Sequence, residues 1–536
     1  DVLHKISKKD EIEIEGLGVF SPEQFLLELI VNGKLFEAER IIYVSDDSLQ
    51  SYLGITEGKY ASFMDFFRGK GDSKIRKFAQ EATQKDPAKR NRWDKEIIKV
   101  GDKMETFYRA QRGELLTIFP TLDSTKNNKW ISIYDEESVK SLVGTLETKG
   151  QSLDLTNYSY VKLLSQYFIF LRKGDYSSAD GMLSLIDQIQ RKYTPEGFLP
   201  SPSKIDLEID YNNSGIFGNI KNYYMYLSVF LLLFAFIEAL VSNRDSGGYK
   251  FLIKFPLLVF TGLFITVFAY HTYGLAVRWY LTSHAPWSNG YEALIFIAWG
   301  TVLAGILFSR YSKITMAGTA FVAFLIVMTA MHENMDPQLT NLVPVLKSYW
   351  LVIHVACITT SYGFFGLGAV LGLIVMGTMI FKTQTNKKRI NLLNSELTLI
   401  NEMTITIGVM LAAVGTFLGG IWANESWGRY WGWDPKETWA LVIVIVYAML
   451  LHFRFVPGFI RSKFFFNAFG TIAGFGAVCM TFFGVNFYFS KSIHSYAAGD
   501  PPAFPIWLWV VLFLIFTLTI VAGIRDFMVD KRGEKK

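Results

Sequence analysis

The sequence has little cysteine, and this scarcity excludes several kinds of site. Its 536 residues include only two cysteines, Cys357 and Cys479, and each lies in an apolar run. The two form neither a Cys-x-x-Cys pair nor a plausible disulfide framework, so the chain has no cysteine-based zinc or redox site. The sequence also lacks a stripe of Lys and Arg, and it therefore does not indicate a nucleic-acid groove.

Charge is also scarce, but only in the second part of the chain. Residues 216–536 carry 23 of the 53 Lys and Arg residues and 14 of the 48 Asp and Glu residues. Residues 1–215 have a net charge of −4 and the remainder one of +9, which together make the total of +5. Because low charge and long apolar runs are typical of membrane helices, the sequence predicts a soluble domain over residues 1–218 and a transmembrane domain over residues 219–536.

The predicted soluble domain has helical patterns of apolar residues but no recognisable catalytic site. Ser21-Pro22-Glu23 has the form of a helix start, and residues 115–135 are compatible with a short hairpin. The domain combines no nucleophile with a base and has no metal-ligand spacing, so its role stays open. The chain begins at Asp1 without an initiator Met or a signal-peptide core, and we expect it to be part of a longer protein.

Nine apolar runs are each close to the roughly 20 residues that a helix needs to cross a bilayer. They lie approximately at residues 221–241, 252–273, 291–308, 315–331, 350–381, 402–422, 439–453, 466–489 and 505–524. If residues 1–215 lie outside the cytoplasm, the inward-facing segments hold 17 Lys and Arg residues and the outward-facing ones hold six. The fold expected is therefore mainly α, a bundle of about nine transmembrane helices preceded by a mostly helical extracytoplasmic domain.

A tryptophan-rich loop, near residues 422–439, connects the sixth and seventh expected spans and faces outward. Its aromatic residues are Trp422, Trp427, Tyr430, Trp431, Trp433 and Trp439. One interpretation is an interfacial aromatic belt, which is common where membrane helices meet water. The other is a binding platform, since Gly428 and Gly432 allow close approach of the backbone and indoles stack on large planar molecules. The residues alone leave both interpretations open.

Two histidines on the same outward side favour the platform. His354 lies a few residues into the fifth span, and His494 follows the eighth. Two neutral imidazoles can ligate an iron from opposite sides, as in six-coordinate haem. A single intramembrane histidine is more often structural, but two beside a tryptophan-rich loop reverse that preference.

The other histidines near the membrane give weaker signals. His452 lies near the inner end of the seventh span, where an ionisable group is costly and is a functional candidate by default. No partner at the same depth is evident, because His271 lies near the outer end of its span. His452 is therefore either structural or partnered by a missing segment or subunit. His284 either shapes the rim of a site or is a plain loop residue, and His332 is expected to be a loop residue.

The string WGRYWGWDPKETWAL closely resembles the tryptophan-rich "WWD" signature of haem-handling proteins, in particular the system II cytochrome c synthases of the CcsA or ResC type. RWYLTSHAPWSNGYEA resembles the first outward loop of that family. SYWLVIHV and IHSYAAGDPP resemble the segments that carry its two outward histidines. The resemblance spans most of residues 220–525 in four ordered motifs.

The resemblance implies a site and a reaction. His354 and His494 would ligate the iron of an outer haem, and His452 would ligate an inner haem. The cofactor-binding aromatic residues would be Trp422, Trp427, Tyr430, Trp431, Trp433 and Trp439, and the catalytic set would be His354, His494, Trp427, Trp431, Trp433 and Asp434. The reaction would be that of a holocytochrome c synthase, in which ferrous haem b is joined by thioether bonds to an apocytochrome c Cys-x-x-Cys-His. This chain has no such motif, so attachment would occur on a partner.

The resemblance also implies partners and a location. Residues 1–218 would be the second part of a CcsB-like half, whose N-terminal transmembrane segment is missing here and would supply the partner of His452. The apocytochrome and thiol-reducing proteins would be further partners, and no nucleic acid is expected. The location implied is the bacterial inner membrane, with a periplasmic active face.

Several alternatives stay open at this point. The bundle could export or chaperone haem without ligase activity, or it could transfer electrons across the membrane, although the histidine spacing disfavours the latter. A system I haem chaperone is a fourth possibility, but the run from Asp434 to Thr438 favours system II.

Asp434 and Lys436 could contact a haem propionate or the apocytochrome. Helix capping by Asp434, with Pro435 at the first helical position and Glu437 three residues on, is at least as plausible.

Overall fold

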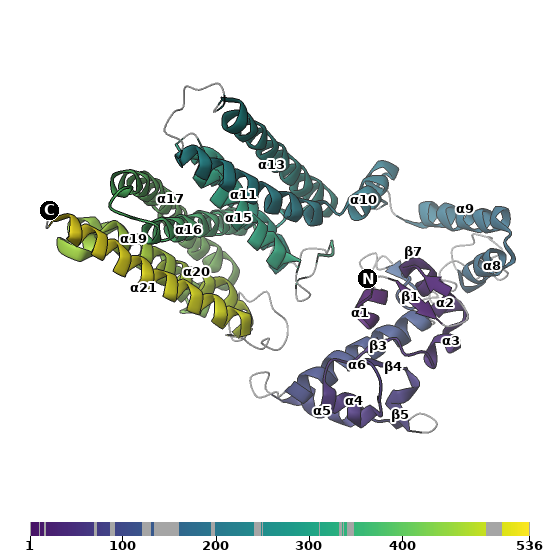
Figure 1. Cartoon of the computed structure of the whole chain (residues 1–536). Coiled ribbons are helices and arrows are strands. Elements are labelled where there is room, and N and C mark those ends of the chain that lie inside the picture. The colour runs from purple at the N-terminus through teal and green to yellow at the C-terminus, as the bar shows by residue number, and fades with distance from the viewer. Residues whose placement is uncertain are drawn as a thin grey trace. The chain divides into compact units, whose positions relative to one another are not determined.

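The computed structural model describes most of the chain. The described residues are 2–9, 11–14, 18–68, 72–85, 92–120, 130–132, 160–194, 199–240, 248, 250–309, 311–331, 335, 337–339, 348–488 and 506–534. The chain divides into two compact units, Asp1–Pro202 and Ser203–Lys536 (Figure 1).

The first unit is mostly helical, with short antiparallel hairpins. Its helices are α1 (Val2–Ser7), α2 (Pro22–Val31), α3 (Gly33–Glu37), α4 (Asp47–Leu53), the 3-10 helix η1 (Met64–Phe66), α5 (Arg76–Gln84), α6 (Arg92–Gln111), α8 (Tyr160–Lys173) and α9 (Tyr176–Tyr193). Its strands pair as β1 (Ile12–Ile14) with β2 (Gly18–Phe20), β3 (Ile42–Tyr43) with β4 (Tyr60–Ala61), β5 (Phe67–Arg68) with β6 (Asp72–Ser73), and β7 (Phe119–Pro120) with β8 (Trp130–Ile131).

Two local predictions for this unit are confirmed. Ser21 caps α2 in a capping box: its hydroxyl accepts a hydrogen bond from the Gln24 N–H, and the Gln24 side chain accepts one from the Ser21 N–H. The hairpin expected within residues 115–135 is β7–β8, in which Phe119 pairs with Ile131. The small strands at 12–20, 42–43 and 60–73 were not expected from the helical pattern, because each is only two or three residues long.

The second unit is a bundle of long apolar helices. Its elements are α10 (Pro202–Ser214), α11 (Ile216–Leu240), the π-helix η4 (Lys250–Lys254), α13 (Phe255–Thr282), α14 (Gly290–Phe308), α15 (Lys313–Ala330), α16 (Tyr349–Ile380), α17 (Lys387–Trp427), α18 (Pro435–His452), the 3-10 helices η6 (Phe453–Phe455) and η7 (Gly458–Arg461), α19 (Lys463–Phe469), the π-helix η8 (Gly470–Gly474), α20 (Phe475–Cys479), the π-helix η9 (Met480–Tyr488) and α21 (Ile506–Glu534).

Eight helical segments among the described residues are long and apolar enough to cross a membrane: Phe251–Thr282, Gly290–Phe308, Lys313–Ala330, Tyr349–Ile380, Lys387–Trp427, Pro435–Phe455, Lys463–Asn486 and Leu508–Val529. The expected span at 221–241 falls on α11, which is not one of these eight. The expected mainly α, polytopic class is thus confirmed, and eight of the nine expected spans correspond to these segments.

Burial separates the centre of the bundle from its periphery. The spans of α14, α15 and α16 are mostly buried, whereas those of α13, α18 and α21 contain few buried residues. Exposed apolar surface of this extent on long helices is the surface that lipid covers. α16 and α17 lie side by side in Figure 1, and α18 packs on α17, so these three helices bring the histidine and tryptophan motifs into one neighbourhood.

Candidate functional site

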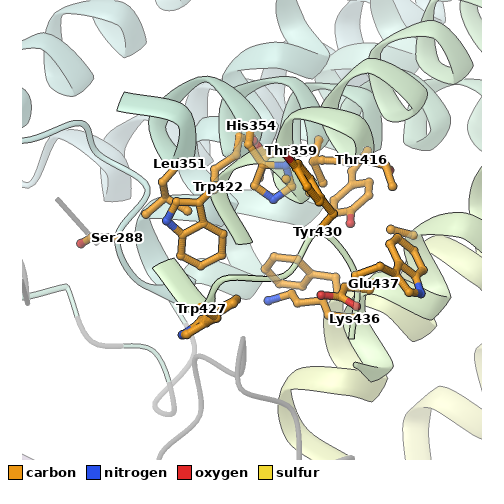
Figure 2. A pocket seen from close by; sticks show the side chains of 18 of the residues that line it. Ser288, Leu351, His354, Thr359, Thr416, Trp422, Trp427, Tyr430, Lys436 and Glu437 are labelled. Atoms are coloured by element: carbon orange, nitrogen blue, oxygen red, sulfur yellow. The ribbon is translucent and has the colours of Figure 1, made fainter. Parts of the chain in front are cut away.

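One end of α16, α17 and α18 encloses a cavity of about 330 Å³ (Figure 2). The size falls in the range typical of sites for small molecules and cofactors. The connection between α13 and α14 contributes Ser288 and Asn289 to its lining, and η9 contributes Phe482. The walls are mainly aromatic and aliphatic, with a few polar groups that include His354, Lys436 and Glu437. Such a cavity suits an apolar ligand that is oriented by a few polar contacts.

His354 is held in this cavity by the neighbouring helix. It lies in the second turn of α16, and its Nδ1 is 2.6 Å from the carbonyl oxygen of Gly415 on α17. Because a carbonyl oxygen only accepts hydrogen bonds, Nδ1 carries the proton and donates it. In the neutral ring the lone pair then resides on Nε2, which is the arrangement that metal-binding imidazoles use.

Two further residues of α17 confine the same ring. The His354 and Trp422 rings lie nearly parallel, with centroids 6.5 Å apart and an interplanar angle of 13°. A Cβ at Gly419 would lie 2.5 Å from the Cε1 atom of His354 and 2.7 Å from its Nδ1. Gly415, Gly419 and Trp422 follow the i, i+4, i+7 spacing, so one face of α17 both orients the imidazole and makes room for it.

The tryptophan-rich loop is built from a helix end and a helix start. α17 ends at Trp427, and Gly428 follows in the left-handed conformation with φ of 71°. α18 begins with a capping box: the Asp434 carboxylate accepts from the Lys436 N–H at 3.1 Å, and the Glu437 Oε2 accepts from the Asp434 N–H at 3.2 Å. The same Glu437 oxygen also accepts from the Gly432 N–H at 2.8 Å. The capping interpretation of Asp434 is therefore confirmed, and its catalytic role stays a prediction.

The structure divides the aromatic residues of the motif into three groups. Four of them line the cavity, namely Trp422, Trp427, Tyr430 and Trp431, and Trp422 meets Trp427 edge to face with centroids 4.7 Å apart. Trp433 is 73% exposed and adopts φ of 57°, a conformation that is uncommon for a residue with a side chain. It is not in the cavity lining, and Trp439 packs instead against the main hydrophobic core.

The other candidate histidines do not join His354 in the described part of the structure. His494 and His332 lie outside the described residues. His452 is exposed at the last residue of α18, with Nδ1 2.7 Å from the Ala448 oxygen, about 25 Å along the helix from the cavity end. The His284 Nδ1 is 3.1 Å from the Ala285 oxygen, and this residue does not line the cavity.

His271 has a structural role. It is fully buried in α13, with its Nδ1 3.2 Å from the Tyr224 hydroxyl and its Nε2 3.1 Å from the Ile295 carbonyl oxygen. The carbonyl requires a proton on Nε2, so Nδ1 accepts from the hydroxyl, and both ring nitrogens are satisfied. The residue ties α11, α13 and α14 together.

A buried ion pair beneath the α13–α14 connection was not identified from the sequence. Nε of Arg278 lies 2.6 Å from Oε1 of Glu292, and both side chains are 1% exposed. Arg278 also donates to the Pro337 and Gln338 carbonyl oxygens, at 2.8 and 2.7 Å. The Glu292 Oε2 accepts from both the N–H and the hydroxyl of Ser288, each at 2.7 Å. The pair therefore fixes the loop that places Ser288 and Asn289 in the cavity lining. In the sequence, only the presence of an Arg and a Glu in the segment RWYLTSHAPWSNGYEA could have indicated this ion pair.

Lys436, which the sequence offered as a possible contact of a haem propionate or the apocytochrome, has a partner that was not expected. Its ammonium group lies in the cavity lining and donates to the Asn486 Oδ1 at 3.0 Å. The Asn486 Nδ2 in turn donates to the Phe482 carbonyl oxygen at 2.6 Å, and Asn486 is 2% exposed. A residue from η9, fifty positions further along the chain, thus holds this cation in place.

Comparisons with known proteins agree with the motifs. Residues 287–494 match the family model described as "Cytochrome C assembly protein". The chain is 35% identical to the protein NrfI of Wolinella succinogenes over 94% of this chain and 52% of that protein, so it spans about half of the length of NrfI.

Cytochrome c biogenesis proteins CcsA are covered more completely. The identity is 31% with CcsA of Pyropia yezoensis, over 42% of this chain and 82% of that protein. With CcsA of Prochlorococcus marinus (strain MIT 9313) the identity is 33%, over 47% of this chain and 86% of that protein. A fold of long apolar helices, an ordered set of motifs and this coverage lead to one conclusion: the chain is a multi-pass membrane protein that belongs to the CcsA family of cytochrome c biogenesis proteins.

Proposed function

We propose that this chain is the haem-handling part of a holocytochrome c synthase, which presents haem to an apocytochrome c and joins the two by thioether bonds. The observation that carries the proposal is His354, whose Nδ1 is committed to the Gly415 carbonyl in a cavity lined by Trp422, Trp427 and Trp431. An oriented imidazole with its lone pair on Nε2 suits an iron, and indole faces suit a porphyrin.

The main requirement of the proposed reaction is that the protein positions the vinyl groups of haem next to the cysteine thiols. In each thioether step a cysteine S–H adds across a vinyl C=C bond: one vinyl carbon forms the C–S bond, and the other takes up the hydrogen. Electrons balance within the step, so no external oxidant is required. The aromatic walls would hold the macrocycle while His354 fixes the iron, so that the vinyl groups lie where the thiols arrive. Holding two reactants in a near-attack geometry supplies a large part of such a rate enhancement.

The remaining parts of the proposal concern groups beyond this cavity. His494 would be the second axial ligand, and the histidine of the apocytochrome would replace one of the two during transfer. His452, exposed at the far end of α18, would receive haem on the cytoplasmic side with a partner from a CcsB-like segment. The proposed substrate is haem b in the ferrous state, and thiol-reducing proteins are proposed partners. The proposed location is the bacterial inner membrane, with the active face toward the periplasm.

The first test is His354→Ala, with His284→Ala as the matched control because His284 does not line the cavity. We expect the full-length protein to co-purify with low-spin haem and to yield covalent haem on a co-expressed apocytochrome. His354→Ala should lose most of both signals, and His284→Ala should keep them. The measurements are reduced and oxidised absorption spectra and the haem stain of denatured apocytochrome.

The outcomes separate the competing functions. If His354→Ala retains both the spectrum and the covalent product, His354 is not part of the mechanism. If the unaltered protein binds haem but leaves none attached to the apocytochrome in a reconstituted membrane, export or chaperoning of haem replaces the synthase proposal.

A comparison of Trp431→Ala with Trp433→Ala tests the aromatic platform against the interfacial belt. The two residues are neighbours in one loop, but only Trp431 lines the cavity. Loss of a stacked indole should lower haem affinity about tenfold in Trp431→Ala, whereas the exposed Trp433 should matter less than about twofold. Haem titration of the purified variants measures this difference. Equal small effects would favour the belt.

A further inference from the structure

Lys436 places a positive charge in a cavity whose walls are mainly aromatic and aliphatic. Lys436 is the second residue of α18, and its side chain forms part of the cavity lining together with Tyr430, Trp431 and Phe482. Taking an ammonium group out of water is costly unless other groups compensate it. A charge that is kept at this place is therefore a candidate for recognition of an anionic group.

The structure holds the ammonium group in a defined position. Its hydrogen bond to the Asn486 Oδ1 is 3.0 Å, and the Asn486 amide is oriented by its own donation to the Phe482 carbonyl at 2.6 Å. An ammonium group has three N–H donors, so it can hold Asn486 and a ligand oxygen at the same time. The fixed geometry lowers the entropy that a contact with a ligand would cost.

The start of α18 adds to the positive potential. The N-terminus of a helix of 18 residues favours anions through its oriented N–H groups. Asp434 and Glu437 carry the opposite charge in the same turn, but their carboxylates accept hydrogen bonds from the backbone N–H groups of Lys436, Gly432 and Asp434. These bonds direct both carboxylates toward the loop backbone.

We infer that Lys436 binds a carboxylate at the edge of the planar ligand, and that in haem this carboxylate is a propionate. The inference rests on the proposed function and assigns it a residue that sets the orientation of the macrocycle. Figure 2 shows His354 and Lys436 on opposite sides of the cavity, with aromatic side chains between them. A ligand with a central metal, an aromatic ring and a peripheral carboxylate matches this order of groups. With the propionate edge anchored at Lys436, the vinyl edge points away from it.

The test compares haem with haem dimethyl ester, in which both propionates are esterified. For each protein, the measured quantity is the ratio of the affinity for haem to the affinity for the ester. We expect this ratio to be at least about tenfold larger in the full-length unaltered protein than in Lys436→Met. Lys436→Arg keeps the charge and should keep most of the preference. Lys221→Met, on α11 and outside the cavity lining, is the matched control and should leave the ratio unchanged.

The ratio separates recognition from a structural role. If Lys436 only ties α18 to η9, Lys436→Met weakens haem and ester equally and the ratio stays constant, which overturns the inference. A constant ratio with reduced attachment would point to contact with the apocytochrome and would overturn it as well. His354→Ala should weaken both ligands without changing the ratio. If the unaltered protein gives no His354-dependent spectrum with either ligand, the proposed function fails and the inference fails with it.

Discussion

Glu292→Leu is expected to destabilise the membrane unit by about 3–5 kcal/mol, because it leaves the Arg278 guanidinium buried without its carboxylate. Arg278 is 1% exposed, so water cannot replace the lost partner. The change also removes the acceptor of both Ser288 hydrogen bonds, which releases the loop at the cavity. Thermal unfolding of the purified protein in detergent measures the loss of stability, and haem titration measures the effect on the cavity.

Two control variants make this prediction specific. Glu425→Gln alters an exposed carboxylate that accepts from Ser348, and we expect a change below about 1 kcal/mol. The double variant Arg278→Met/Glu292→Leu removes both charges and should recover part of the stability, since an apolar pair of similar volume avoids the uncompensated charge. A Glu292→Leu protein as stable as the parent would show that the pair does not support the fold.

Gly419→Ala is expected to abolish low-spin haem binding about as fully as His354→Ala does. Its added Cβ would lie 2.5 Å from the Cε1 atom of His354, so the ring must move. The ring cannot move far and keep its bond to the Gly415 carbonyl, which is only 2.6 Å long, or its near-parallel arrangement with Trp422. We therefore expect at least a tenfold loss of the low-spin absorption signal, since the iron loses one axial ligand.

The matched control for Gly419 is Gly377→Ala on α16, where an added Cβ meets no atom within 4 Å. Replacing a helical glycine at an open position is neutral or slightly stabilising, so this variant should keep both its melting temperature and its spectrum. Retention of the low-spin signal in Gly419→Ala would mean that the imidazole of His354 does not need this position on α17.

Features that depend on near neighbours could be predicted from the sequence. The change in charge density near residue 216 predicted a soluble part followed by a membrane part, because a bilayer tolerates few charges wherever the chain folds. Asp434-Pro435 with Glu437 predicted the start of α18, since a capping box involves residues only three apart. The tryptophan-rich loop and His354 were identified in the same way, from residue types within short segments.

Features that depend on helix packing were decided only by the tertiary structure. The six aromatic residues of the motif appear equivalent in sequence, yet the positive φ of Trp433 and the packing of Trp439 take these two away from the cavity. Lys436 meets Asn486 across fifty residues, and His354 meets Gly415 across sixty-one. Periodicity says which face of a helix is apolar, but it does not say which residue of another helix will lie opposite. The sequence alone therefore determined the class of protein and its motifs, whereas the packing of α16, α17 and α18 decided which side chains share a cavity.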